Sequence, residues 1–236
     1  MAMITVRNKH PLLKLLKMIL RLFYPRHAIA GMENVLPDLP AAYICNHLET
    51  YSPIVLSLYF PFPYRPWVHA SVMTRELCRD YLEKDFTRKT LKLHPPFSRW
   101  LAAILAPLCI GLMRSIDAIP VYRGQMKVRD TFAISVQALK QGNNLLIFPE
   151  KQSLRTSETV SEFHTGFISL ARYYLQATGK TLRFYPVHIS SKEKIITIGK
   201  AIEYIPAKNF YSEKARITAE LQKAINEIAI RNGGSK

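Results

Sequence analysis

A short apolar run that ends abruptly at two polar residues is the feature that most limits how this chain folds. Residues 41–45 read Ala-Ala-Tyr-Ile-Cys, and Asn46 and His47 follow at once. An apolar run of this length predicts a short strand that is buried on both faces. Asn46 and His47 then lie at its carboxyl end, which is where open α/β sheets bind their ligands.

Three later stretches share this pattern of a short apolar run that contains or meets polar residues. They are Ile119-Pro120-Val121-Tyr122-Arg123, Asn144-Leu145-Leu146-Ile147-Phe148-Pro149-Glu150 and Phe184-Tyr185-Pro186-Val187-His188-Ile189. Residues 127–141, between the first two, predict a helix with Gly142 as its C-terminal stop. A strand, a helix and a strand in succession indicate a parallel pair with a right-handed crossover. We therefore expect polar groups from several strand ends to form one site.

The length of the chain limits it to one sizeable core. Its 236 residues suffice for a single α/β domain and leave little for a second. The predicted fold is a mixed, largely parallel sheet flanked by helices, with an amphipathic helix before it. We expect residues 1–27 to form this membrane-interface helix and residues 28–236 to form the α/β domain.

The N-terminal helix is predicted from residues 12–24, which are strongly apolar. Their charges, Lys14, Lys17 and Arg21, are spaced by three and four residues and so form one stripe. Thirteen residues give about 20 Å of helix, which is shorter than a hydrocarbon core of about 30 Å. The helix is therefore expected to lie in the membrane interface, or alternatively to pack on the domain's own core. A signal peptide is a weaker interpretation, because the stretch is charged and no clear cleavage site follows.

The remaining elements follow from periodicity and turn residues. Strands are predicted at 67–72, 183–190 and 194–202, the last two as a hairpin, and helices at 52–58, 75–85, 165–176 and 213–231. Residues 100–113 form the most apolar helical stretch, interrupted by Pro107 and too short to span a bilayer. This stretch is expected to be buried in the protein or to enter a membrane in part. Within the protein it would either line an acyl-chain tunnel or be an ordinary core helix.

Charge and cysteine content restrict the partners and the compartment. The net charge of +16 predicts an anionic partner, and the absence of a recognisable nucleic-acid module favours a membrane surface over nucleic acid. The three cysteines, Cys45, Cys78 and Cys109, are far apart in apolar surroundings, which fits a reducing compartment. Cys45 is expected to be a buried structural thiol rather than a nucleophile.

At these stretches the sequence resembles the glycerolipid acyltransferase family, typified by 1-acylglycerol-3-phosphate acyltransferase. The family's blocks read Asn-His-x4-Asp, Ile-Pro-Val-x-Arg, Phe-Pro-Glu-Gly-Thr-Arg-Ser and a strand like Val-Pro-Val. The matching residues are Asn46-His47, Ile119-Pro120-Val121-Tyr122-Arg123, Phe148-Pro149-Glu150 and Tyr185-Pro186-Val187. Phe163-His164-Thr165-Gly166 matches the family's Phe-x-x-Gly, and the order agrees over roughly residues 40–190.

The resemblance implies a reaction and a set of residues. A fatty acyl group would pass from acyl-CoA or acyl-carrier protein, as co-substrate and with no cofactor, to a hydroxyl of a lysophospholipid or glycerol-phosphate-type acceptor. His47 would be the general base, and Asn46, Arg123 and Glu150 would help to bind the substrate. The enzyme would act in phospholipid biosynthesis as a peripheral protein on the cytoplasmic face of a membrane.

Two departures from the family's blocks bear on activity. Ser52 stands where the family has Asp, and Lys151-Gln152-Ser153 follow Glu150 where it has Gly-Thr-Arg. Ser52 is expected either to accept an N–H bond from the His47 ring and so assist catalysis, or to be engaged by a backbone N–H in capping the next helix. Lys151 and Arg155 would partly replace the missing Arg as phosphate contacts.

The departures leave a second function open. A catalytically impaired or inactive protein of this fold would bind lipid or a protein partner instead. Glu49 would replace the missing Asp only if its segment is extended, because two residues along a helix would turn it away from the His47 ring.

Overall fold

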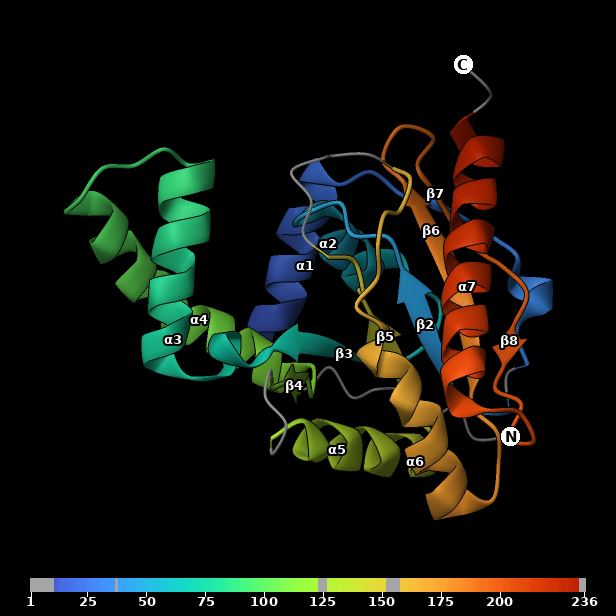
Figure 1. Ribbon diagram of the computed structural model, residues 1–236. Coiled ribbons are helices and arrows are strands. Elements are labelled where there is room, and N and C mark those ends of the chain that lie inside the picture. The colour runs from blue at the N-terminus through green and yellow to red at the C-terminus, as the bar shows by residue number, and fades with distance from the viewer. Residues whose placement is uncertain (1–10, 37, 123–126, 152–157, 234–236) are drawn as a thin grey trace.

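The computed structural model describes residues 11–36, 38–122, 127–151 and 158–233, and shows a central sheet between helical layers with a helical lobe at one side (Figure 1). The strands are β1 (Ala28–Ala30), β2 (Ala41–Cys45), β3 (Tyr64–His69), β4 (Ile119–Val121), β5 (Asn144–Ile147), β6 (Arg183–Ser190), β7 (Ile195–Ile198) and β8 (Ile202–Glu203). The α-helices are α1 (Pro11–Phe23), α2 (Tyr51–Tyr59), α3 (Arg75–Tyr81), α4 (Phe97–Ser115), α5 (Val128–Lys140), α6 (Ser169–Thr178) and α7 (Phe210–Gly233). A π-helical segment, Leu82–Thr90, lies between α3 and α4.

The sheet is mixed and largely parallel, as predicted. Its order is β1-β7-β6-β2-β5-β3-β4, with β8 also paired to β6. The strands β6, β2, β5, β3 and β4 run parallel to one another, so their carboxyl ends share one edge of the sheet. β4 and β5 have the predicted common direction, but β3 lies between them. The predicted hairpin of β6 and β7 is confirmed.

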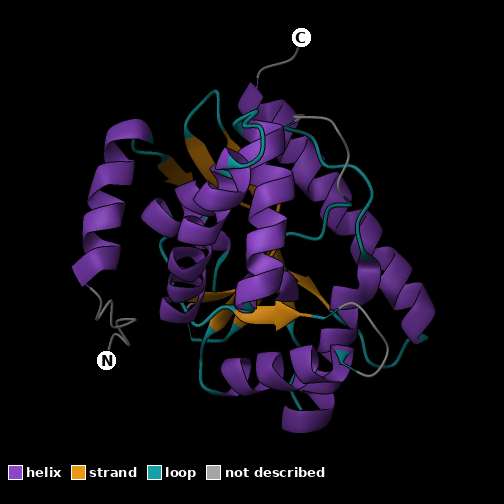
Figure 2. Cartoon of the chain, turned by 90° about the vertical axis from the view of Figure 1, so that its left-hand side faces the viewer, coloured by secondary structure: helices purple, strands orange, loops and turns teal. Residues whose placement is uncertain are grey.

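β2 lies at the centre of the sheet and packs on both faces. No residue of β2 is more than 2% exposed. Ala42 and Ile44 face a core shared with α5, α6 and α7, whereas Tyr43 and Cys45 face a second core shared with α2. The helices therefore cover both faces of the sheet (Figure 2), which is why its central strand is an unbroken apolar run.

The predicted strand 194–202 is divided in the structure. β7 ends at Ile198, Gly199 leaves the ladder, and β8 begins at Ile202. The residue on β6 opposite this break is Pro186, which accepts a bond from the Gly199 N–H but has no N–H to return. A side chain at position 199 would also meet the Pro186 ring, since a Cβ there would lie 2.7 Å from it.

Residues 75–115, from α3 through the π-helical segment to α4, form the lobe that projects from the sheet (Figure 1). The prediction that its apolar helix is too short to span a bilayer is wrong. α4 has 19 residues and continues through Pro107, and by length and composition alone it is sufficient to cross a membrane. Only 22% of that apolar window is buried, so α4 is also not an ordinary core helix.

The N-terminal helix α1 lies along the outside of the domain (Figure 2). Its apolar side chains remain exposed: Leu15 by 49%, Met18 by 59% and Leu22 by 81%. These positions are spaced by three and four residues and so share one face. The described part of α1 therefore does not bury this face against the domain's own core.

Candidate active site

The amide of Asn46 fastens the end of β2 to β6. Asn46 is fully buried; its Nδ2 donates to the Ile189 carbonyl at 3.1 Å, and its Oδ1 accepts from the Ile189 N–H at 2.8 Å. Both ends of the amide are thus occupied by backbone groups of one residue. This geometry favours a positioning role for Asn46 over the predicted contact with substrate.

His47 lies at the shared carboxyl edge, directly beyond β2. Its backbone N–H donates to Oε2 of Glu150 at 2.8 Å, and its ring centroid lies 4.9 Å from that of Phe148. Glu150 and Phe148 both follow β5, the neighbour of β2. The structure therefore brings His47 and Glu150 together, as the sequence predicts, and the residue remains exposed at this edge.

The surroundings of the His47 ring favour its neutral form. Desolvation by the packed protein atoms lowers the pKa of His47, and the negative charge of Glu49 partly opposes this by raising it. A neutral imidazole at physiological pH is what a general base requires.

Glu49 affects the ring because the segment after His47 is not helical. Residues 46–50 form a turn before α2, and Glu49 has a φ of 46°. The condition under which Glu49 would point away, a helical segment, is therefore not met. Glu49 therefore supplies a negative charge that acts on the imidazole.

The Ser52 side chain makes a hydrogen bond within that same turn. Its side chain is fully buried, and its Oγ accepts from the Leu48 N–H at 3.0 Å. Within the described residues, no hydrogen bond joins Ser52 or a carboxylate to the His47 imidazole. Of the two alternatives for Ser52, engagement by a backbone N–H is the one observed, although the N–H is that of Leu48 rather than one inside α2.

The carboxylate of Glu150 joins three segments of the chain. Oε2 accepts from the His47 N–H, and Oε1 accepts from the Ser161 N–H at 3.2 Å. A single bridge pairs Glu150 with Phe163, so the chain on either side of the loop runs antiparallel. Glu150 therefore holds the base in place from β5, in addition to any contact with substrate.

Lys151, which replaces the family's Gly, faces outward beside this carboxylate. Its Nζ lies 2.6 Å from Oε2 of Glu162, and their side chains are 50% and 79% exposed. An exposed pair of this kind contributes little to stability. The ammonium group of Lys151 is therefore accessible to an anionic group that approaches the site.

Arg123 and Arg155, both predicted to contact phosphate, lie outside the described residues. β4, which leads towards Arg123, ends on the same edge of the sheet as β2. β3 pairs with β5 at Tyr64–Pro66 and with β4 at Trp67–His69, so β4 is staggered towards that edge. With neighbouring strands about 4.8 Å apart, β4 lies roughly 14 Å from β2.

Glu158 is a structural residue that sequence reasoning missed. Its carboxylate accepts from the Ser190 hydroxyl at 2.9 Å and from the Ser191 N–H at 2.8 Å. Desolvation raises its pKa, but the hydrogen bonds from Ser191 and Ser190 outweigh it, so the pKa of Glu158 is lowered overall. Glu158 thus anchors the chain before Ser161 to the turn after β6. No local pattern in the sequence marks this contact.

Two other kinds of site, a cysteine nucleophile and a metal centre, are less favoured than the histidine site. Cys45 is fully buried, and desolvation raises the pKa of its thiol well above the ordinary value, which confirms a structural thiol. In the part of the chain that the structure describes, no cluster of His, Cys, Asp and Glu is placed to hold a metal ion.

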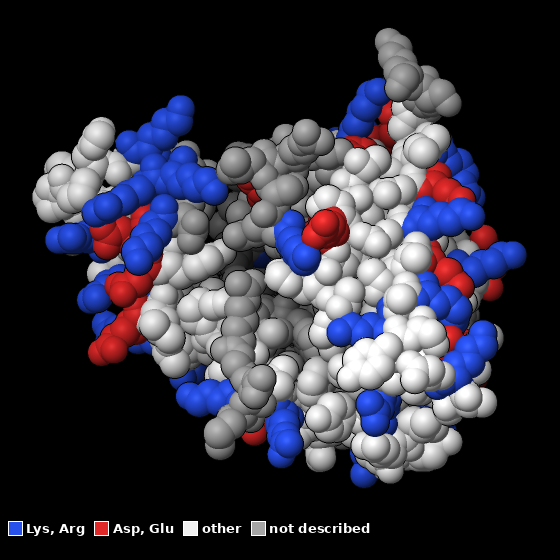
Figure 3. Space-filling model, viewed as in Figure 1, with Lys and Arg blue, Asp and Glu red and all other residues white. Residues whose placement is uncertain are grey.

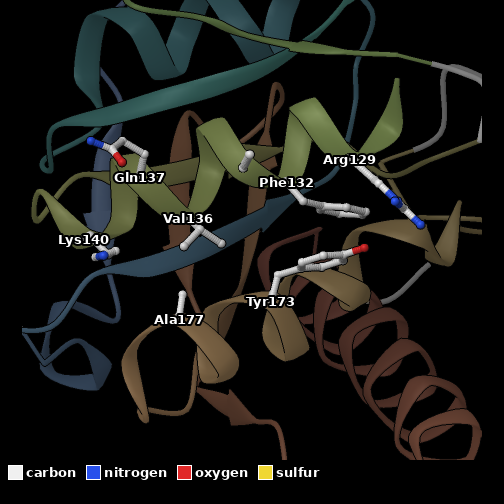
Figure 4. Close-up of a pocket in the computed structure, with 8 residues that line it drawn as sticks. Arg129, Phe132, Val136, Gln137, Lys140, Tyr173 and Ala177 are labelled. Carbon is white, nitrogen blue, oxygen red and sulfur yellow. The ribbon is translucent and has the colours of Figure 1, made fainter. Parts of the chain in front are cut away.

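A shallow groove of about 470 Å³ lies between α5 and α6 (Figure 4). Phe132 and Tyr173 stack across it with centroids 4.9 Å apart, and Arg129 and Lys140 lie along its rim. None of its lining residues belongs to the predicted site. This groove is therefore separate from the edge at which His47 lies.

The site thus consists of a histidine at the carboxyl edge of a largely parallel sheet, and a carboxylate that follows the next strand holds the backbone of this histidine. Residues 96–190 match the model of the acyltransferase family, a range that contains the Arg123, Glu150 and Pro186 blocks and begins after His47. This match covers part of the chain, and it agrees with the resemblance to the glycerolipid acyltransferase family that the sequence blocks carry.

The fold is also similar to that of a solved acyltransferase. The crystal structure of the 1-acyl-sn-glycerophosphate (LPA) acyltransferase PlsC from Thermotoga maritima superposes with a TM-score of 0.56 at 12% sequence identity. The match covers 90% of this chain and 76% of that one. No curated protein matches the sequence. At this identity the likeness establishes the fold, and the substrates remain to be proposed.

Proposed function

We propose that this protein transfers a fatty acyl group from acyl-CoA or acyl-carrier protein to a hydroxyl of a lysophospholipid or glycerol-phosphate-type acceptor. The observation that carries the proposal is the position of His47. Its backbone is held by Glu150, while its imidazole makes no hydrogen bond to the described side chains and so is free to meet a substrate hydroxyl. Desolvation lowers the pKa of His47, which favours the neutral ring.

The chemistry needs one base and one electrophile. The neutral His47 imidazole accepts the proton of the acceptor hydroxyl as its oxygen attacks the thioester carbonyl carbon. The carbon–sulfur bond then breaks, and the proton passes from the imidazolium to the departing thiolate. Lys151, with Arg123 and Arg155, would supply cations for the acceptor phosphate, since cationic side chains bind this group well.

The acceptor lipid resides in a membrane, and the proposed location is peripheral, on the cytoplasmic face. The helix α1 supports the peripheral contact. Its exposed apolar face bears Leu15, Met18 and Leu22, and Lys14 and Arg21 are exposed on the same helix. Burial of the leucines in the acyl boundary and attraction of the cations to anionic lipid act together in such a helix.

Labelled acyl-CoA and a panel of lysophospholipids in detergent micelles test the reaction. We expect turnover by the wild-type chain and a loss of about 10²- to 10⁴-fold for His47→Ala, because a general base contributes about this much to the rate. His94→Ala, which removes an exposed histidine of the remote lobe, is the matched control and should retain activity. Equal turnover by the wild type and His47→Ala would exclude His47 as the base.

One observation favours the second candidate, an inactive protein that binds lipid or a protein partner. The His47 ring lacks a hydrogen-bonded carboxylate among the described residues, and the Ser52 oxygen is engaged by Leu48. In a Ser-His-Asp triad, disabling the carboxylate that orients the histidine costs about 10⁴ in rate. Tight binding of lysophospholipid without turnover, equally in wild type and His47→Ala, would support this candidate.

A further inference from the structure

The tip of the lobe combines exposed apolar side chains with a cluster of cations. Phe97 is 70% exposed, Trp100 67% and Leu91 44%, although all three are large and apolar. Figure 3 shows an uncharged tip beside a group of Lys and Arg side chains at this end of the lobe. We call Arg88, Lys89, Leu91, Lys92, Phe97, Arg99 and Trp100 the lobe tip.

The lobe tip is held in shape by its own interior. The Thr87 hydroxyl, fully buried, donates to the Ser98 carbonyl at 3.1 Å and so joins the π-helical segment to the start of α4. The Leu93 N–H donates to the Thr87 carbonyl at 2.9 Å. The exposed aromatic side chains are therefore displayed by a fixed support rather than by an unstructured loop.

Part of the positive charge at the tip is unpaired. Glu83 bridges Arg88 at 2.6 Å and Arg99 at 3.3 Å, so one carboxylate serves two guanidinium groups. Lys89 and Lys92 are exposed and make no ion pair with described side chains. The tip thus keeps a net positive charge around its aromatic residues.

Apolar residues continue from the tip along one face of α4. Ile104 and Leu108 follow Trp100 at intervals of four residues, and each is 49% exposed. An indole beside cations and ahead of an aliphatic stripe is the arrangement found at the boundary between headgroups and acyl chains. The lobe also rises on the side of the molecule towards which β2 points (Figure 1).

We propose that the lobe tip inserts into an anionic lipid bilayer as a membrane contact separate from α1. Phe97 and Trp100 enter the interface, and Lys89 and Lys92 bind the headgroups. The charge complementarity between the unpaired lysines and anionic lipid favours this occupant. The contact would hold the carboxyl edge of the sheet near lipid whether or not the chain is catalytically active.

Tryptophan fluorescence of the full chain tests insertion directly. The chain has two tryptophans, and the other, Trp67, is half-buried, with its indole N–H bonded to the Ser135 hydroxyl. We expect vesicles of phosphatidylglycerol and phosphatidylcholine with brominated acyl chains to quench part of the emission. That quenched part should vanish in Trp100→Phe, while the emission of Trp67 stays.

Charge variants test the headgroup contact. Lys89→Gln with Lys92→Gln should weaken binding to the anionic vesicles by about thirtyfold, which corresponds to about 1 kcal/mol per lysine. The matched control, Lys180→Gln with Lys200→Gln, removes two exposed lysines elsewhere and should change binding less than about twofold.

Three outcomes would overturn the proposal. Vesicle binding without quenching of Trp100 would show that α1 binds alone. An equal effect of the two lysine pairs would show that only net charge matters. A Trp100 response to an acidic carrier protein and not to vesicles would assign the tip to a protein partner.

Discussion

The strand β2 and the helix α4 are both strongly apolar, yet β2 is buried and α4 is largely exposed. No residue of β2 is more than 2% exposed, whereas Ser98, Ala102, Ala106 and Ile110 are the buried residues among the described ones of α4. β2 is covered by helices on both faces, and α4 is covered mainly from the side of α3 and the π-helical segment. Apolar composition alone therefore does not decide burial here.

The difference indicates how the two regions serve the proposed function. His47 depends on a fixed position, and it follows a strand that is packed on both sides and fastened by Asn46 and Glu150. The lobe contributes a small core of Cys78, Ala106 and Ile110 and leaves its remaining apolar surface outside. The proposed reaction needs the fixed position that the sheet provides, and the proposed lipid contact uses the apolar surface that the lobe leaves exposed.

The largest expected effect is a difference in the free energy of unfolding between matched substitutions in β2 and in α4. Ile44→Ala removes a fully buried side chain from β2 and should lower the free energy of unfolding by about 2–5 kcal/mol. Ile104→Ala makes the same chemical change on α4, where the side chain is 49% exposed, and should cost less than about 1 kcal/mol. Urea unfolding measured in the absence of lipid gives both values. Similar losses for the two variants would mean that the lobe is covered in solution, contrary to its exposed state here.

A smaller effect is expected at Glu150, which fastens the base to β5. Glu150→Gln loses one charged acceptor for the N–H groups of His47 and Ser161, and a charged hydrogen bond contributes about 1.5–3 kcal/mol. Because Glu150 is only partly buried, we expect about 1–2 kcal/mol in unfolding and a fall of roughly 10- to 100-fold in kcat. Glu162→Gln is the matched control, a neighbouring carboxylate with a 79% exposed side chain, and should cost less than about 0.5 kcal/mol. Unaltered kcat in Glu150→Gln would show that His47 keeps its place without this carboxylate.

Much of the fold follows from the sequence, because apolar runs and turn residues act locally. The pattern predicts the range of β6 in full, and β2 and its site at the carboxyl edge follow from residues 41–47. The errors arise where packing overrides local pattern. The break after Ile198 depends on Pro186, which lies on another strand, and α4 extends beyond its predicted range on either side.

The site is also predictable only in part, because some of its contacts follow from local sequence patterns and others from long-range packing. His47 and Glu150 can be placed together because parallel strands bring their carboxyl ends to one edge. That the Glu150 carboxylate meets the backbone of His47 and of Ser161, rather than the imidazole, depends on groups far apart in the sequence. The roles of Asn46 and Glu158 depend equally on long-range backbone groups, which no local pattern specifies.

The smallest expected effect concerns the pH dependence of turnover. Because desolvation lowers the pKa of His47, the acid limb of kcat/KM should have its midpoint below the ordinary histidine value of about 6.5. Glu49 raises this pKa, so Glu49→Gln removes a stabiliser of the imidazolium and should move the midpoint to lower pH, by less than about one unit. Glu76→Gln, which removes an exposed carboxylate from α3 in the lobe, should leave the midpoint unchanged, because the charge that shifts the pKa of His47 is that of Glu49. A rise in the midpoint for Glu49→Gln, or equal shifts in both variants, would show that the titrating group lies outside the turn that carries His47.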